Sequence, residues 1–154
     1  MRGLGQYGII LLVTGVVAAS AQSASRQLVR NHAPNDRALD VPLAALEAEF
    51  ADMGARGRDT TRIIEGGTYS LNARYLVAPE PVPLVHKSIV ELYFVRDGSG
   101  TLVTGGTIVD GKINGGLERI VKAGDVVFIP PGVPHGFIAT AGISYLNVHF
   151  GGTD

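Results

Sequence analysis

The chain contains no cysteine and no tryptophan, and these absences exclude several classes of site. Without cysteine there is no disulfide, zinc–thiolate site, iron–sulfur cluster or thiol nucleophile. Aromatic residues make up only 6% of the sequence, so an aromatic platform for stacking bases or long glycan chains is not indicated. The formal charge of −1 at pH 7 gives no basic surface, and we expect no nucleic-acid partner. Any metal ion must be held by His, Asp, Glu or backbone oxygen atoms.

Glycine, in contrast, is abundant, with 21 of the 154 residues. From residue 60 onward apolar and polar residues alternate, which is typical of strands. At least eight short strands can be counted, separated by Asp-Gly, Gly-Ser-Gly and Gly-Gly turns. The pattern predicts an all-β sandwich or barrel over residues 60–154, without alternating helices.

The first 21 residues have the pattern of a secretory signal peptide. Arg2 is positively charged, residues 7–17 are almost all apolar, and Ala19-Ser20-Ala21 offers a small-residue cleavage site. A membrane anchor is the less favoured alternative, because this apolar run is shorter than the roughly 20 residues that span a bilayer. We therefore predict a periplasmic or secreted protein that is not attached to the membrane after cleavage.

Residues 22–59 are predicted to form an N-terminal arm followed by a helix. Residues 22–39 are polar and aperiodic, which favours a mobile tether carrying a solvent-exposed His32. Asp40 is a suitable N-cap for the helix, and Gly54 is expected to end it.

This helix is expected to pack against the outside of the sheet. The apolar residues that recur at helical spacing are Leu43, Leu46, Phe50 and Met53. The acidic residues Glu47, Glu49 and Asp52 are expected to form a solvated face, which argues against a membrane-surface helix.

Residues 124–135, GDVVFIPPGVPH, combine a short alternating run with a turn and a histidine. The strand must end at Pro130-Pro131, because proline donates no backbone hydrogen bond. Gly132 permits the turn that follows. His135 is therefore expected just beyond a rigid corner, where its side chain is held firmly enough to bind a metal ion.

This segment is one of two that carry a family resemblance. The first segment has His86, Glu91 and Gly98, and the second has Gly124, Pro130, Gly132 and His135. The pair resembles the two-motif signature of the cupin family, over about residues 62–150. The resemblance implies a jelly-roll β-barrel, here with a short N-terminal helix packed outside. Two positions depart from it: Leu84 stands where metal-binding cupins usually have a first histidine, and Ala139 where the family often has asparagine.

His86, Glu91 and His135 are the predicted metal ligands. Two imidazoles and one carboxylate suit iron, and they also suit copper or zinc. We favour copper or iron, with manganese or zinc as alternatives. A buried Glu91 without a cation nearby would carry a heavy desolvation cost, which supports the metal. The alternative is a barrel without metal, in which Glu91 and His135 would form an acid/base pair.

Two further residues are candidates for the site. Tyr93 lies two residues from Glu91 and shares its face of the strand, where its hydroxyl could orient a ligand or a bound substrate. Glu91 and Tyr93 are the predicted catalytic residues. His149, in the last predicted strand, should point the same way as Tyr145 and Asn147 and is a weaker candidate ligand. Lys87 should point away from His86, into solvent.

Together these observations favour a secreted, metal-dependent oxidoreductase. It would present one transition-metal ion, with dioxygen or peroxide, to a saccharide or other small substrate. A small-ligand or sugar-binding barrel without catalysis, and a metal-assisted isomerase, lyase or hydrolase, remain open. Exposed sheet edges and the helix at residues 40–53 suggest a homodimer.

Overall fold

The computed structural model describes residues 28–80 and 82–152, which form one helix and eleven strands. The elements in chain order are β1 (Val29–His32), α1 (Leu43–Arg56), β2 (Thr60–Glu65), β3 (Tyr69–Leu76), β4 (Ile89–Asp97), β5 (Ser99–Thr104), β6 (Thr107–Val109), β7 (Lys112–Asn114), β8 (Leu117–Lys122), β9 (Val126–Ile129), β10 (His135–Thr140) and β11 (Ile143–Gly151). The predicted signal peptide at residues 1–21 lies outside the described residues and stays a prediction, which the mass of the exported chain would test.

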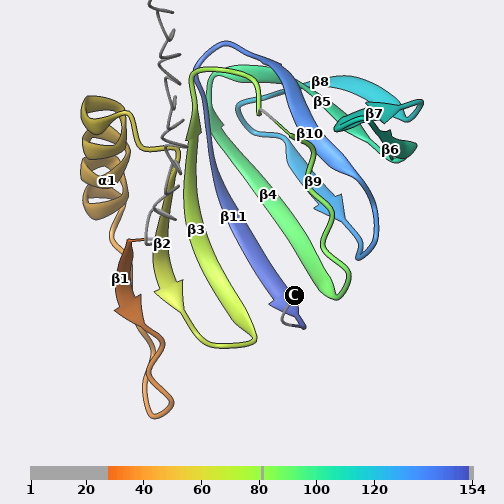
Figure 1. Ribbon diagram of the computed structural model, residues 1–154. Helices are drawn as coiled ribbons and strands as arrows, with labels where there is room; N and C mark the ends of the chain where they lie inside the picture. Colours follow the sequence, from red (N-terminus) through yellow and green to blue (C-terminus); the bar gives the residue numbers. More distant parts are fainter. Residues whose placement is uncertain (1–27, 81, 153–154) are drawn as a thin grey trace, which may run out of the picture.

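The strands form two facing sheets and a small hairpin (Figure 1). The larger sheet has the order β1-β2-β3-β11-β4-β9 and the smaller one β10-β5-β8. The last strand, β11, lies between β3 and β4 and pairs antiparallel with both, so it occupies a central position in the larger sheet. This is the predicted all-β jelly-roll barrel.

The core lies between the two sheets. Inward side chains from β3, β4, β9 and β11 meet those of β5, β8 and β10, as alternation along each strand requires. The buried apolar residues of this core are Leu76, Tyr93, Val95, Leu102, Val121, Val127, Ile129, Phe137, Ile143 and Tyr145. They fill one end of the barrel, so the polar residues of the site lie at the other end of the same strands.

The hairpin β6–β7 projects beside the smaller sheet (Figure 1). Its turn is Asp110-Gly111, and both residues have positive φ, at 49° and 72°. This conformation is the one that Asp-Gly favours in two-residue hairpins. The Asp-Gly turn expected from the sequence is therefore present.

The N-terminal arm is more ordered than the sequence predicts. Residues 29–32 form β1, which pairs in parallel with the otherwise open edge of β2. The Arg62 amide donates to the Leu28 carbonyl and the Ala33 amide to the Glu65 carbonyl, at 2.9 and 2.8 Å. A mobile tether over the whole of residues 22–39 is thus wrong, because the sheet edge offers backbone partners that a polar segment can use. His32 is exposed, as expected.

Helix α1 packs on the outside of β2 and β3, as predicted, through Leu46, Phe50 and Met53. Leu43, expected in the same apolar stripe, is instead 60% exposed, and the limits of the helix also differ. It begins after Pro42, with no side-chain cap, so Asp40 is not its N-cap. It continues through Gly54 and ends at Gly57, whose φ of 62° is left-handed. Gly54 lies inside the helix, where an added Cβ would be 3.3 Å from the Tyr75 ring, so the glycine allows close packing on β3 and does not end the helix.

The acidic face of α1 is only partly solvated. Glu47 is exposed, but Glu49 is 7% exposed, and its carboxylate accepts from Arg30 Nε at 2.7 Å and Arg58 Nη1 at 3.2 Å. The expectation that Glu49 belongs to a solvated face is wrong, because two arginines outside the helix lie over this position. The carboxylate therefore ties β1 and the start of β2 to the helix. Within the described residues no helix has the length and apolar character needed to cross a membrane.

We predict that Glu49→Gln lowers the free energy of unfolding by about 1–3 kcal/mol, because a charged hydrogen-bond acceptor for two arginines is lost. Urea unfolding followed by circular dichroism would measure the change. The matched control is Glu47→Gln on the exposed face, for which we expect a change within about 0.5 kcal/mol. Equal effects of the two substitutions would contradict the bridging role of Glu49.

Candidate metal centre

The register of the larger sheet places two polar side chains opposite each other inside the barrel. Glu91 on β4 is the cross-strand partner of His149 on β11, and His149 is in turn the partner of Ser70 on β3. One step further along the same strands, Tyr93, Asn147 and Asn72 form the next inward row. Because inward residues recur every second position, these rows lie directly above the apolar core.

A corner of the chain supplies His135. Strand β9 ends at Ile129, Pro130-Pro131 cannot continue it, and Gly132 turns the chain with φ of 77°. His135 then begins β10 and is 1% exposed. The corner predicted from the sequence is therefore present, and it points the imidazole into the barrel.

The segment that carries His86 is joined directly to this corner. Leu84 and His135 exchange both backbone hydrogen bonds, at 2.8 and 2.9 Å, and the Gly132 amide donates to the His86 carbonyl at 2.7 Å. The two segments that resemble the family motifs are thus held together through their backbones. Leu84, where the family usually has a first histidine, contributes only its backbone here, through its two hydrogen bonds with His135.

Three of the chain's four histidines meet at Glu91. His86 Nε2 and His135 Nε2 lie 3.2 and 3.0 Å from Glu91 Oε1, and His149 Nε2 lies 3.1 Å from Oε2. Glu91 itself is 1% exposed. The nitrogen and carboxylate atoms of His86, Glu91 and His149 all lie within 4.8 Å of one another, which is close enough to share one metal ion.

The tautomer of His135 determines how its Nε2 atom faces the Glu91 carboxylate. Its Nδ1 lies 2.9 Å from the Val133 carbonyl, which can only accept, so Nδ1 carries the proton. In the neutral ring Nε2 then directs a lone pair toward Glu91 Oε1. Both atoms are buried and neither has a hydrogen-bond partner. A cation between them, either a proton on Nε2 or a metal ion, removes this conflict.

Asn147 completes the polar environment of Glu91. Its Nδ2 donates to Glu91 Oε2 at 2.8 Å and lies 2.8 Å from His149 Nε2. His149 Nε2 also lies 3.1 Å from Glu91 Oε2, so it donates to the carboxylate in one tautomer and accepts from Asn147 in the other. Imidazole nitrogens and carboxylate oxygens therefore face one another, and together they form the donor set of a transition-metal site.

The pKa values of these groups follow from the same contacts. Burial raises the pKa of Glu91, but His135 and His149 outweigh it and hold this pKa far below the usual range. Burial lowers the pKa of His135, but the neighbouring Glu91 carboxylate raises this pKa by a larger amount, so the net shift is upward. Burial also raises the pKa of Tyr93 well above 10, so its phenol is neutral.

His86 and His135, two of the predicted ligands, thus both contact Glu91, the third. The group whose ligand atoms all lie within 4.8 Å of one another, however, is His86, Glu91 and His149, and it does not include His135. The sequence placed His149 on the same face as Tyr145 and Asn147, which is correct, but gave no register between β11 and β4. Tyr93 lies in the next row, with its ring centroid 6.3 Å from that of His135. Lys87 is exposed, as expected.

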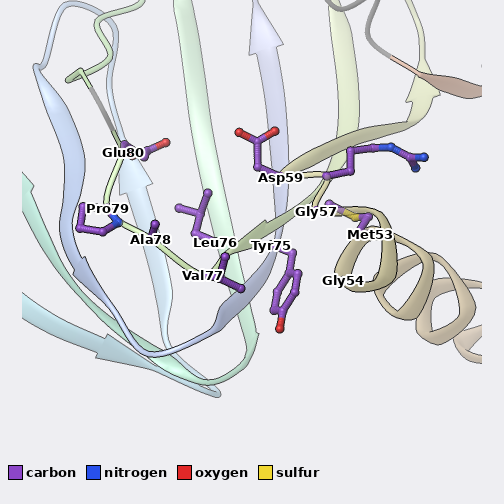
Figure 2. Close-up of a pocket in the computed structure, with 11 residues that line it drawn as sticks. Met53, Gly54, Gly57, Asp59, Tyr75, Leu76, Val77, Ala78, Pro79 and Glu80 are labelled. Carbon is purple, nitrogen blue, oxygen red and sulfur yellow. The ribbon is translucent and has the colours of Figure 1, made fainter.

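Two cavities open at the cluster. One, of about 230 Å³, is lined by residues of β2, β3, β4 and β11 together with Leu84 and His86. The second, of about 320 Å³, lies beside it, around Ser70, Ile89 and Gly152. A third cavity, of about 170 Å³, lies between the end of α1 and the segment after β3, and Figure 2 shows that it is lined by Met53, Tyr75 and Glu80 among others. None of the three histidines lines this third cavity.

Residues 73–148 match the protein family described as "Cupin domain". None of the curated proteins matches the chain. Among solved structures, BH2720 from Bacillus halodurans is 15% identical, with a TM-score of 0.56, and the match covers 78% of this chain and 85% of that one. This likeness concerns the fold alone.

Two other solved structures match over shorter stretches. A cupin protein from Bacteroides fragilis, BF4112, is 21% identical over 55% of this chain and 66% of its own, with a TM-score of 0.43. YcfD, a ribosomal oxygenase from Escherichia coli, is 22% identical over 55% of this chain and 23% of its own, with a TM-score of 0.47. The match spans less than two thirds of each of these two proteins.

The family match and the fold therefore agree. Both motif segments of the sequence lie within residues 73–148, and in the structure they are the two segments that carry His86, Glu91 and His135. Residues 73–148 of the chain are a cupin domain.

Proposed function

We propose that this chain binds one divalent transition-metal ion through His86, Glu91, His135 and His149. The observation that supports this most strongly is the buried pair of His135 Nε2 and Glu91 Oε1, 3.0 Å apart and both without a hydrogen-bond partner. His149 takes the place of the ligand that Leu84 cannot supply. The site thus has four candidate ligands although one motif position is lost.

We further propose that the protein is a metal-dependent oxidoreductase acting on a small substrate, which includes saccharides. Three imidazoles and one carboxylate suit copper or iron, and manganese or zinc less specifically. Bound copper or iron would supply redox chemistry with dioxygen or peroxide. The cavity of about 230 Å³ beside the ligands leaves room for a small molecule to approach them.

The chain's own residues would orient the ligands and donate a hydrogen bond to the substrate. The Val133 carbonyl fixes the tautomer of His135, and Asn147 fixes the Glu91 carboxylate. Tyr93 lines the same cavity, and its raised pKa keeps the phenol protonated, so it can donate a hydrogen bond to a bound substrate. The apolar core beneath excludes water from the floor of the site.

We also propose that the protein is a homodimer. Phe94 on β4 and its neighbours Val126 and Phe128 on β9 lie on the outer face of the larger sheet, with 41%, 61% and 59% of their surface exposed. Strand β9 is the last strand of that sheet in the described residues. A second copy would cover this apolar edge.

We predict that the wild-type protein binds one equivalent of copper, iron or zinc, as measured by elemental analysis after dialysis. His135→Ala and His149→Ala should each weaken binding by about 100-fold or more, because each removes a ligand. The matched control is His32→Ala, which removes the one histidine outside the cluster and should leave binding unchanged.

Wild-type protein with metal only at trace level would overturn the metal proposal and favour a ligand-binding barrel. If metal binds, oxygen and peroxide consumption over a substrate panel tests the redox proposal, with the zinc-loaded protein as control. A copper- or iron-loaded protein that consumes neither oxidant but converts a substrate would instead indicate an isomerase, lyase or hydrolase.

We predict that metal affinity falls as the pH is lowered through the range in which His135 titrates, because a proton competes with the ion for His135 Nε2. The Glu91 carboxylate raises the pKa of His135, so this loss begins at a higher pH than for an ordinary histidine. For one displaced proton, affinity should change about tenfold per pH unit below that pKa. Competition with a chromophoric chelator would measure it, and a constant affinity over this range would contradict the assignment of His135.

We predict that Phe128→Glu converts the dimer to a monomer, because it places a charge in the apolar edge. Light scattering at micromolar concentration would measure the mass. Ile120→Glu is the matched control, since Ile120 is 74% exposed but lies on β8 of the smaller sheet, and it should leave the dimer intact. A monomeric wild type would refute the proposal.

A further inference from the structure

One arginine faces the opening of the candidate metal centre. The two cavities at the cluster share three lining residues, Arg62, His86 and His149. Arg62 therefore lines the same space as two of the candidate ligands, although it comes from β2, two strands away from His149 in the sheet. The place of Arg62 beside the candidate ligands could not be predicted from the sequence, because Arg62 lies outside both motif segments.

The guanidinium of Arg62 is held in place by hydrogen bonds, but not all of its N–H groups have a partner among the described residues. Its Nε donates to Asn72 Oδ1 at 3.1 Å, and its Nη1 pairs with the Glu65 carboxylate. Asn72 is buried and donates in turn to the Ser70 hydroxyl and the Asn147 carbonyl. Among the described residues Nη2 has no partner, so a fixed guanidinium retains N–H groups that can bind an oxyanion.

The charges around the cavity do not cancel once a divalent ion is bound. Arg62 is neutralised by Glu65, and Arg74, on the cavity wall, by Glu80 at 2.6 Å. Histidines bind metal in the neutral form, so Glu91 is the one charged ligand. The ion and its ligands then carry a net charge of about +1 in a partly enclosed space, which a single negative charge would balance.

From this we propose that the substrate of the site is a small carboxylic acid, whose carboxylate is bound by Arg62 at the mouth of the metal centre. The inference rests on the proposed metal function and names the substrate class for it. A planar carboxylate matches the guanidinium fork and carries the required single charge. A phosphate dianion fits less well, because Glu65 on the same guanidinium repels a second negative charge more strongly. The cavity of about 230 Å³ limits the acid to a few carbon atoms in its bound part.

The test uses the full chain loaded with cobalt(II), whose visible absorption reports on molecules that bind at or beside the ion. Three probes of similar size are titrated separately: glycolate, inorganic phosphate and ethylene glycol. In the wild type we expect glycolate to change the spectrum at a concentration about tenfold lower than phosphate, and ethylene glycol to have no effect. This comparison requires no variant.

Arg62→Gln should bind glycolate about tenfold more weakly than the wild type while keeping one equivalent of cobalt. Arg62→Lys, which keeps the charge but loses the fork, should lie between the two. The matched control is Arg119→Gln on β8, whose guanidinium bonds Thr104 in the smaller sheet and lies outside both cavities. It should bind glycolate like the wild type.

Two failures can be told apart. If the wild type takes up no cobalt, the metal proposal fails and this inference fails with it. If cobalt binds but glycolate acts equally on the wild type and Arg62→Gln, or no better than phosphate or ethylene glycol on the wild type, the carboxylate proposal alone is overturned.

Discussion

The buried carboxylate of Glu91 is the group on which the site depends. With 1% of its surface exposed, it has lost its hydration, and the nearest basic groups are three imidazoles rather than an arginine or lysine. Burying an ionised carboxylate is costly unless a cation compensates. His135 Nε2 and His149 Nε2 both lie within 3.1 Å of the Glu91 carboxylate, so that cation is either a proton on these groups or a metal ion.

The fold brings these groups together in two ways. Strand register fixes Glu91 opposite His149, since β11 lies directly beside β4. Backbone hydrogen bonds fix the other pair, because the segment of Leu84 and His86 is bonded to the corner that ends at His135. Glu91 and His149 therefore come from the inner face of the larger sheet, and His86 and His135 from two segments that are joined by backbone hydrogen bonds. The apolar core lies on the closed side of them and the cavities on the open side.

The sequence predicted the barrel, the outer helix and the meeting of His86, Glu91 and His135, because alternation and motif spacing are local patterns. It did not predict that His149 joins them, since that depends on which strand β11 pairs with. Nor did it predict β1 or the burial of Glu49, because both depend on partners distant in the chain: the free edge of β2 for β1, and Arg30 and Arg58 for Glu49. The polar segment that forms β1 has no apolar alternation to reveal it, and the Arg62 contacts likewise become visible only when β2 and β3 are paired.

The most direct test of the central claim is anomalous diffraction from crystals of the metal-loaded protein, recorded at the absorption edge of the bound metal. The proposed site predicts one strong peak among the imidazole rings of His86, His135 and His149 and the Glu91 carboxylate. A crystal of loaded protein with no peak at this position, or with the metal bound only elsewhere, would contradict the assignment of this cluster as a metal centre.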